Sequence, residues 1–194
     1  LSAATHNPDS GLPTWLIVFA LAMGGFGIGT GEFAIMGLMP NVAQDLGVSE
    51  PQVGHLISTY ALGVVVGAPI LAILGAQLFR RQLLILLMSF YALGNLASAL
   101  ASNYESLLVF RFIAGLPHGA YFGVAALVAA SLVPVHKRAK AVSQIMMGLT
   151  LALLIGNPLA TVMGQSMNWR YAFGFVGLVS LLTVVLVALF LPKN

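Results

Sequence analysis

The sequence contains no cysteine and very few charged residues. Asp, Glu, Lys and Arg together make up 7% of the 194 residues, whereas hydrophobic residues make up 59%. Without cysteine the chain cannot form a disulfide, a thiolate metal site or a cysteine nucleophile. Ordinary soluble domains carry about a quarter charged residues, and so few charges cannot cover the surface of a soluble globule. The composition therefore argues against a water-soluble domain and indicates a membrane protein.

Signatures of soluble chemistry are also missing. The formal net charge is only +3, and the basic residues are scattered among apolar runs, so no basic face is available for nucleic acid. The sequence has no phosphate-binding loop, no paired-histidine zinc helix and no serine nucleophile elbow. We therefore expect no nucleic-acid partner, no metal, no cofactor and no enzymatic activity. A membrane enzyme ranks third, after the two functions considered below.

Apolar runs of the length that a transmembrane helix needs, about 20 residues, occur six times. Clusters of charge, proline, asparagine and serine separate them. We expect membrane spans at Thr14–Met39, Gln52–Leu78, Leu83–Ala101, Glu105–Leu132, Ala139–Gln165 and Trp169–Leu191. The connections between these spans are too short to hold a soluble domain.

The charged residues between the spans predict the orientation of the chain. Cytoplasmic loops of membrane proteins hold an excess of Lys and Arg. One side carries Arg80, Arg81, Lys137, Arg138, Lys140 and Lys193. The opposite loops carry Asp45, Glu50, Glu105 and a single basic residue, Arg170. Both termini are therefore predicted to be cytoplasmic, with residues 1–13 as an N-terminal tail, and the missing initial methionine indicates that the natural start lies upstream.

A pattern of glycine and proline recurs at an offset of 89 residues. The pattern is Gly-x-Pro-x5-Gly, and its copies are Gly67-Ala68-Pro69 with Gly75 and Gly156-Asn157-Pro158 with Gly164. The same offset carries Arg81 onto Arg170. Because three helices are an odd number, a second unit of three must start from the opposite face of the membrane. We predict an all-α membrane protein whose six transmembrane helices form two inverted three-helix repeats, residues 14–101 and 102–194; chance recurrence of residues common in membrane helices is the alternative.

The spans differ in polarity. The third and sixth are apolar nearly all round apart from Asn95 and a few hydroxyl groups, which favours helices that face lipid. The first holds five glycines between Gly24 and Gly31. Such a run suits either tight helix packing or a mobile helix that lines a cavity.

Two opposite charges lie at matching depths inside the spans. Glu32 is about eight residues from the predicted outer end of its span, or roughly 12 Å deep at 1.5 Å per residue, and Arg111 of the fourth span is nearly level with it. A buried charge costs about 2.5 to 3.5 kcal/mol unless it pairs or faces a wet cavity. We expect the two to pair, either as a static brace or across a cavity where Glu32 exchanges a proton. Tyr60 and Asn157 fall at a similar level.

His118 follows Arg111 by seven residues, which returns it to the same helix face about 10 Å deeper. An imidazole there can relay a proton or contact substrate, or it can stay neutral with a hydroxyl or carbonyl as partner. The preceding Pro117 should kink the helix. Met36, one turn after Glu32, is a candidate for packing or for a substrate pocket.

Several segments resemble a known transporter family. Three segments in the first span and the loop after it carry the resemblance: Thr30-Gly31-Glu32-Phe33, Gly37-Leu38-Met39-Pro40 and Asp45-Leu46-Gly47-Val48-Ser49. They resemble the opening of the drug and sugar-efflux proton antiporters of the major facilitator superfamily, the DHA1 type. The fourth span is similar to the family's R-x-x-x-G motif, as Arg111 with Gly115, and continues with Pro117-His118 as in arabinose-efflux-like permeases. The fifth is similar to the antiporter motif at Gly148 and Gly156-Asn157-Pro158, and Trp169-Arg170 matches the start of the sixth. The cytoplasmic loop keeps only the motif's final basic pair, Arg80 and Arg81.

The resemblance implies a function and a role for each residue. It implies export of a small organic solute, such as a drug, sugar or nucleoside, in exchange for protons across a bacterial inner (plasma) membrane. Glu32 would carry the proton and Arg111 would be its electrostatic partner. His118, Tyr60, Asn157 and Met36 would line the substrate route, and Gly156 with Pro158 would bend the fifth helix.

Family members have twelve helices, so the resemblance is to an N-terminal half. Such a half would work with a C-terminal six-helix half, or else with a second copy of itself. A six-helix membrane scaffold or accessory subunit without transport of its own is the alternative function.

Overall fold

A computed structural model describes residues 12–193, and within that range the chain forms helices and no β-strand. Six helical segments of the described chain are long and apolar enough to cross a membrane. We number them as spans one to six: Thr14–Leu46, Glu50–Gly75, Arg80–Ala99, Tyr104–Ser131, Val135–Ser166 and Trp169–Phe190. The predicted all-α membrane class is thereby confirmed. The predicted N-terminal tail lies outside the described residues up to position 11.

The first span is longer than the sequence predicts. It comprises the helix α1 (Thr14–Phe33), the 3-10 turn η1 (Ala34–Leu38) and the helix α2 (Met39–Leu46). The predicted end at Met39 is wrong because Pro40 occupies the first turn of α2, where a missing N–H costs nothing. The segment ends instead at Gly47, whose φ of 66° forms a left-handed C-cap. The other predicted boundaries agree with the helices within four residues.

Of the remaining five spans, three are single helices and two are interrupted. The second, third and sixth spans are single helices, α3 (Glu50–Gly75), α4 (Arg80–Ala99) and α9 (Trp169–Phe190). The fourth is divided into α5 (Tyr104–Gly115) and α6 (His118–Ser131), and the interruption falls at Pro117, where the sequence predicts a kink. The fifth comprises η2 (Val135–Lys137), α7 (Arg138–Leu151), the π-helical turn η3 (Ala152–Gly156) and α8 (Asn157–Ser166).

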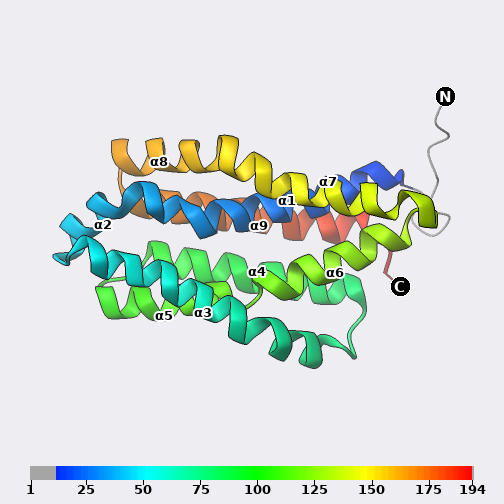
Figure 1. Cartoon of the computed structure of the whole chain (residues 1–194), viewed down its shortest axis with the longest axis horizontal. Helices are drawn as coiled ribbons and strands as arrows, with labels where there is room; N and C mark the ends of the chain where they lie inside the picture. Colours follow the sequence, from blue (N-terminus) through cyan, green and yellow to red (C-terminus); the bar gives the residue numbers. More distant parts are fainter. Residues whose placement is uncertain (1–11, 194) are drawn as a thin grey trace.

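The helices form two groups that each draw on both halves of the sequence. Figure 1 shows α1 beside α7, α8 and α9 on one side of the bundle, and α3, α4, α5 and α6 on the other, where α5 and α6 pack on both α3 and α4. The first span therefore packs on the fifth and sixth, and the fourth packs on the second and third. The two groups meet chiefly where α4 packs along α9.

Glycines allow these helices to approach closely. A Cβ at Gly67 of α3 would overlap the backbone of Leu116, and a Cβ at Gly148 of α7 would lie 3.0 Å from the backbone nitrogen of Phe26. A Cβ at Gly156 would lie 3.0 Å from the Phe26 ring. Small residues at such crossings let backbones pack without side chains between them. Gly67 therefore lies at a close contact between the second and fourth spans, and Gly148 and Gly156 lie at close contacts between the fifth and first.

Two arginines link α4 and α9 in a reciprocal way. Arg81, in the first turn of α4, donates to the carbonyl of Ala188 near the end of α9, with Nη2 and oxygen 2.7 Å apart. Arg170, in the first turn of α9, donates to the carbonyl of Ala99 at the end of α4 and to that of Ala101. The 89-residue offset that carries Arg81 onto Arg170 also carries Ala99 onto Ala188. The helices therefore run antiparallel, each with its last carbonyls bound by an arginine of the other. Arg80 is exposed.

The expectation that the third and sixth spans face lipid holds for one side of each helix. Leu93 of α4 and Leu178 of α9 are exposed, whereas Tyr91, Asn95 and Ser180 on the same helices are buried. The largest exposed apolar faces belong to the second and fifth spans, of which only 22% and 28% are buried. The packing of α4 along α9 buries part of both helices.

Candidate functional site

Polar side chains from five helices gather where α1 gives way to the 3-10 turn η1. We call Glu32, Tyr60, Tyr91, Arg111 and His118 the polar cluster. Glu32 is the penultimate residue of α1, and His118 is the first residue of α6. Their side chains are 27% and 15% exposed, whereas Tyr60, Tyr91 and Arg111 are buried. The cluster therefore has one accessible edge, formed by a carboxylate and an imidazole.

Arg111 binds the backbone at the end of α1. Its Nη1 donates to the carbonyl of Gly31 at 2.9 Å, and its Nη2 to the carbonyl of Glu32 at 3.5 Å. Carbonyls at the end of an α-helix lack their usual partners, and the change to 3-10 geometry at Ala34 creates such an end inside the membrane. The guanidinium carbon also lies 4.5 Å from the centroid of the Tyr60 ring. Arg111 therefore stabilises the interruption of the first span.

The Glu32 carboxylate faces His118 and not Arg111. Within the described residues, the ion pairs closer than 4.0 Å are Glu32 Oε2 with His118 Nδ1, at 3.9 Å, and Asp45 with Arg170, at 3.6 Å. The predicted pairing of Glu32 with Arg111 is therefore not a direct ion pair within the described residues, although the two residues touch through the Glu32 backbone. The two terminal nitrogens of the guanidinium are directed to backbone carbonyls, and its face lies over the ring of Tyr60.

A line of hydrogen bonds extends from His118 into the core. The Tyr60 Oη lies 3.0 Å from His118 Nδ1 and 3.5 Å from the Tyr91 Oη. The Tyr91 hydroxyl donates to the carbonyl of Ile28 at 3.0 Å. The sequence analysis missed Tyr91 because it stands in a span that is otherwise apolar. No charge and no motif in that span marks Tyr91 as part of a site.

The structure brings together only some of the predicted substrate-binding residues. Tyr60 belongs to the polar cluster but is 1% exposed, so it lies behind His118 and not on an open surface. Met36 in η1 is 47% exposed. Asn157 is partly buried at the start of α8, and its Oδ1 has no hydrogen-bond partner among the described residues. No hydrogen bond or ion pair within residues 12–193 joins Met36 or Asn157 to the cluster.

The predicted motif residues hold the helices that carry the cluster. A Cβ at Gly115 would overlap the backbone of Tyr60, so this glycine lets α5 bring Arg111 against α3. Pro117 ends the α5 segment and leaves His118 at the start of α6. Pro158 occupies the first turn of α8, directly after the π-helical turn.

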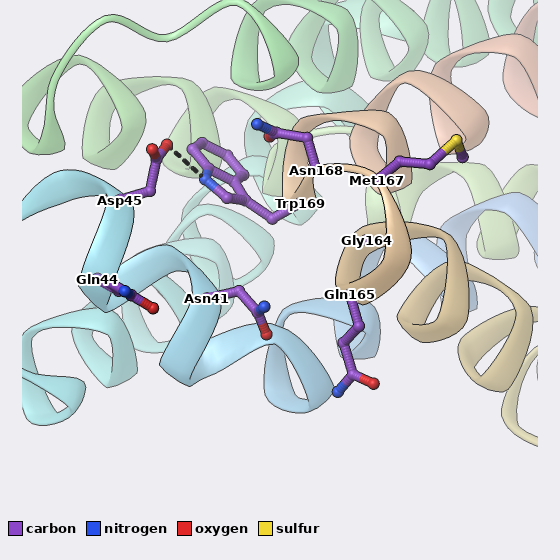
Figure 2. A pocket seen from close by; sticks show the side chains of 8 residues that line it. All are labelled: Asn41, Gln44, Asp45, Gly164, Gln165, Met167, Asn168 and Trp169. Carbon is purple, nitrogen blue, oxygen red and sulfur yellow. Dashed lines mark hydrogen bonds between the residues drawn. The ribbon is translucent and has the colours of Figure 1, made fainter.

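A separate pocket lies between α2, α8 and the start of α9, and Figure 2 shows it from close by. Its volume is about 420 Å³, and its lining is Asn41, Gln44, Asp45, Gly164, Gln165, Met167, Asn168 and Trp169. Asp45 accepts a hydrogen bond from Trp169 Nε1 at 2.8 Å. That bond and the ion pair with Arg170 connect α2 to α9. No member of the polar cluster lines this pocket.

Comparison with known proteins shows the family of the chain. The sequence profile of the Major Facilitator Superfamily matches residues 21–194. The chain belongs to this superfamily. The inner membrane transport protein YdhP of Escherichia coli is 47% identical over 177 residues, which cover 91% of this chain and 46% of that protein. The putative transporter AraJ of Escherichia coli is 39% identical over 91% of this chain and 45% of that protein.

The superfamily assignment extends to more distant relatives. The uncharacterized transporter YtbD of Bacillus subtilis is 38% identical over 98% of this chain and 47% of its own length. The chain thus spans about half the length of the curated relatives it matches. These relatives are named as transporters, which agrees with the prediction that the chain is not an enzyme.

Solved structures share the fold. The proton:xylose symporter XylE superposes with a TM-score of 0.81 at 19% identity, over 90% of this chain and 44% of that one. A bacterial homolog of the human lysosomal transporter Spinster gives a TM-score of 0.76 at 17% identity, over 91% of this chain and 42% of that one. The six-helix arrangement is therefore that of half of a major facilitator.

Proposed function

We propose that the chain is the N-terminal half of a proton-coupled secondary transporter that exports small organic solutes by alternating access. In this proposal it belongs to the drug and sugar-efflux branch of the superfamily, lies in a bacterial inner membrane and has both termini in the cytoplasm. The names of the relatives support the membrane assignment, since YdhP is called an inner membrane transport protein.

The contact between Glu32 and His118 is the observation that carries the proposal. A carboxylate inside a membrane span is costly unless it is paired or reaches water, and Glu32 is partly exposed beside an imidazole 3.9 Å away. Two groups that bind protons within such reach can exchange one between them. Glu32 would take up the proton, and His118 would receive it or hold the carboxylate in its charged form.

Arg111 would supply a constant positive charge beneath this pair. It is buried, and its guanidinium is held by the carbonyls of Gly31 and Glu32. Because the contact is made to the backbone, protonation of the Glu32 carboxylate leaves it in place. The arginine would therefore keep the end of α1 fixed through the cycle.

Alternating access would need a partner for the exposed faces of the second and fifth spans. In such transporters one half rocks against another around a central site. The apolar side chains Val65, Ile73, Leu154 and Val162 are more than 60% exposed on these spans. The partner would be a C-terminal six-helix half, which the half-length match to the relatives favours over a second copy of this chain. The packing of the first span on the fifth, and the paired contacts of Arg81 and Arg170, support two inverted units within this half.

The solute would be a small organic molecule of the drug, sugar or nucleoside type. It would contact the accessible edge of the polar cluster at His118 and Glu32, with Met36 and Asn157 on the flanking helices.

Replacing the Glu32 carboxylate tests the proposal. Glu32→Gln in the full-length protein should remove solute movement driven by a proton gradient, because an amide cannot bind and release a proton, while the protein stays folded. The assay is uptake of a panel of radiolabelled sugars, nucleosides and a cationic dye into everted vesicles with an acidic interior. Glu105→Gln is the matched control, since Glu105 is an exposed carboxylate at the start of α5. Equal gradient-driven uptake by the Glu32 variant and the control would contradict the proposal. If the proton gradient drives no solute uptake in the wild type or in either variant, the alternative of a membrane scaffold without transport is favoured.

A further inference from the structure

Tyr91 lies at the inner end of the hydrogen-bond line that begins at His118. Its Oη is within 3.5 Å of the Tyr60 Oη and 3.0 Å of the carbonyl of Ile28, and its side chain is buried. The hydroxyl of Tyr91 has no accessible surface at this place. We propose that Tyr91 is a positioning residue that lets Tyr60 change from donor to acceptor when His118 gains a proton. The inference rests on the proposed proton coupling and extends it to a residue of the third span.

The direction of each hydrogen bond follows from the number of hydrogens available. A backbone carbonyl only accepts, so the single hydrogen of the Tyr91 hydroxyl goes to Ile28, and the Tyr91 oxygen stays free to accept another. Tyr60 also has one hydrogen, and it has two acceptors within reach, His118 Nδ1 and Tyr91 Oη. Which acceptor it uses depends on whether His118 Nδ1 carries a hydrogen.

A proton on His118 reverses this bond without moving the rings. While neutral His118 carries its hydrogen on Nε2, Tyr60 donates to Nδ1. When Glu32 passes a proton to Nδ1, the O–H bond of the carboxyl breaks and an N–H bond forms, so Nδ1 becomes a donor to the Tyr60 oxygen at 3.0 Å and the charged ring stays beside the Glu32 carboxylate. The Tyr60 hydrogen then rotates to the Tyr91 oxygen, which the Ile28 carbonyl has left free. One proton moves from Glu32 to His118, and each hydroxyl stays satisfied.

The surroundings contain other charged and titratable groups, but their contacts stay constant. Arg111 from α5 binds the carbonyls of Gly31 and Glu32 and stacks on the Tyr60 ring in either state. Tyr121 from α6 donates to the carbonyl of Leu21 at 2.7 Å and makes no hydrogen bond to Tyr60 or His118 within the described chain. The groups that change partner are therefore Glu32, His118 and Tyr60, with Tyr91 as the acceptor that makes the change possible.

Nitrogen-15 NMR of histidine-labelled full-length protein in detergent micelles tests the inference without a known solute. The His118 ring signals are assigned by their loss in His118→Gln, and the pH midpoint of their titration is measured. In Tyr91→Phe the rotated Tyr60 hydroxyl has no acceptor, so the midpoint should move to lower pH by about one unit, a tenfold change in the protonation equilibrium. In the Tyr60→Phe background, Tyr91→Phe should cause no further shift.

Tyr121→Phe is the matched control, because it also removes a buried hydroxyl that donates to a backbone carbonyl of α1. It should leave the His118 midpoint unchanged. A folded Tyr91→Phe that titrates like the wild type would overturn the inference, as would an equal shift in Tyr121→Phe. The wild type alone provides a second measurement: if neutral His118 carries its hydrogen on Nδ1, Tyr60 is always an acceptor and the inference is wrong. Failure of Glu32→Gln to abolish coupling would overturn the proposed function and leave these NMR outcomes intact.

Discussion

The glycine at the end of α5 should control how closely the fourth span approaches the second. A Cβ at Gly115 would overlap the carbonyl of Tyr60 and lie 3.2 Å from the backbone nitrogen of Val64. Backbone atoms cannot rotate away as a side chain can, so Gly115→Ala must push α5 from α3. Overpacking of this kind typically costs about 1 to 3 kcal/mol, and at this crossing we expect the upper part of that range.

The same substitution also has a favourable effect that must be subtracted. Alanine is better than glycine inside a helix by about 1 kcal/mol. Subtracting this gain from the packing cost leaves a net destabilisation of about 1 to 2 kcal/mol for Gly115→Ala. Gly123 of α6 offers the matched control, because a Cβ there would meet nothing within 4 Å. Gly123→Ala should therefore leave stability unchanged or raise it by up to about 1 kcal/mol.

Thermal unfolding of both variants in the same detergent, followed by circular dichroism, measures the difference. The sign is the decisive result: a lower melting temperature for Gly115→Ala and an equal or higher one for Gly123→Ala. If both variants shift in the same direction by the same amount, close backbone packing at Gly115 does not limit the approach of α5. A second consequence is functional, since displacing α5 would separate Arg111 from the Tyr60 ring and from the end of α1.

Two further predictions concern α4. Arg81→Gln and Arg170→Gln should each lower the free energy of unfolding by about 1 kcal/mol, because each removes a charged donor from the carbonyls at a helix end. Arg80→Gln is the control: this arginine is exposed, so its replacement should leave the melting temperature unchanged. For the orientation, a cysteine at Gln82 should react with an impermeant thiol reagent only from the cytoplasmic side and one at Ser102 only from outside; reversed labelling would show that the predicted topology is wrong.

The sequence by itself was sufficient for the class and the layout of the chain. Hydropathy and charge are properties of contiguous segments, so the six spans could be located within a few residues apart from the end of the first. The glycine and proline pattern predicted two inverted units, and it named no pair of spans that cross. The depth of Glu32 was counted from an end of the first span that proved to be seven residues too early, so the match in depth with Arg111 did not follow from the sequence alone.

Only the tertiary structure decided which of these residues touch. Glu32 and Arg111 were expected to pair because their charges are opposite and level, but depth says nothing about the direction in which a side chain points. The 3-10 turn after α1 exposes carbonyls that bind Arg111, and the interruption at Pro117 places His118 opposite the carboxylate. Tyr91 joined the cluster through packing of a span that appeared apolar throughout. Contacts of this kind depend on how helices distant in sequence are interrupted and rotated against one another, which no single segment encodes.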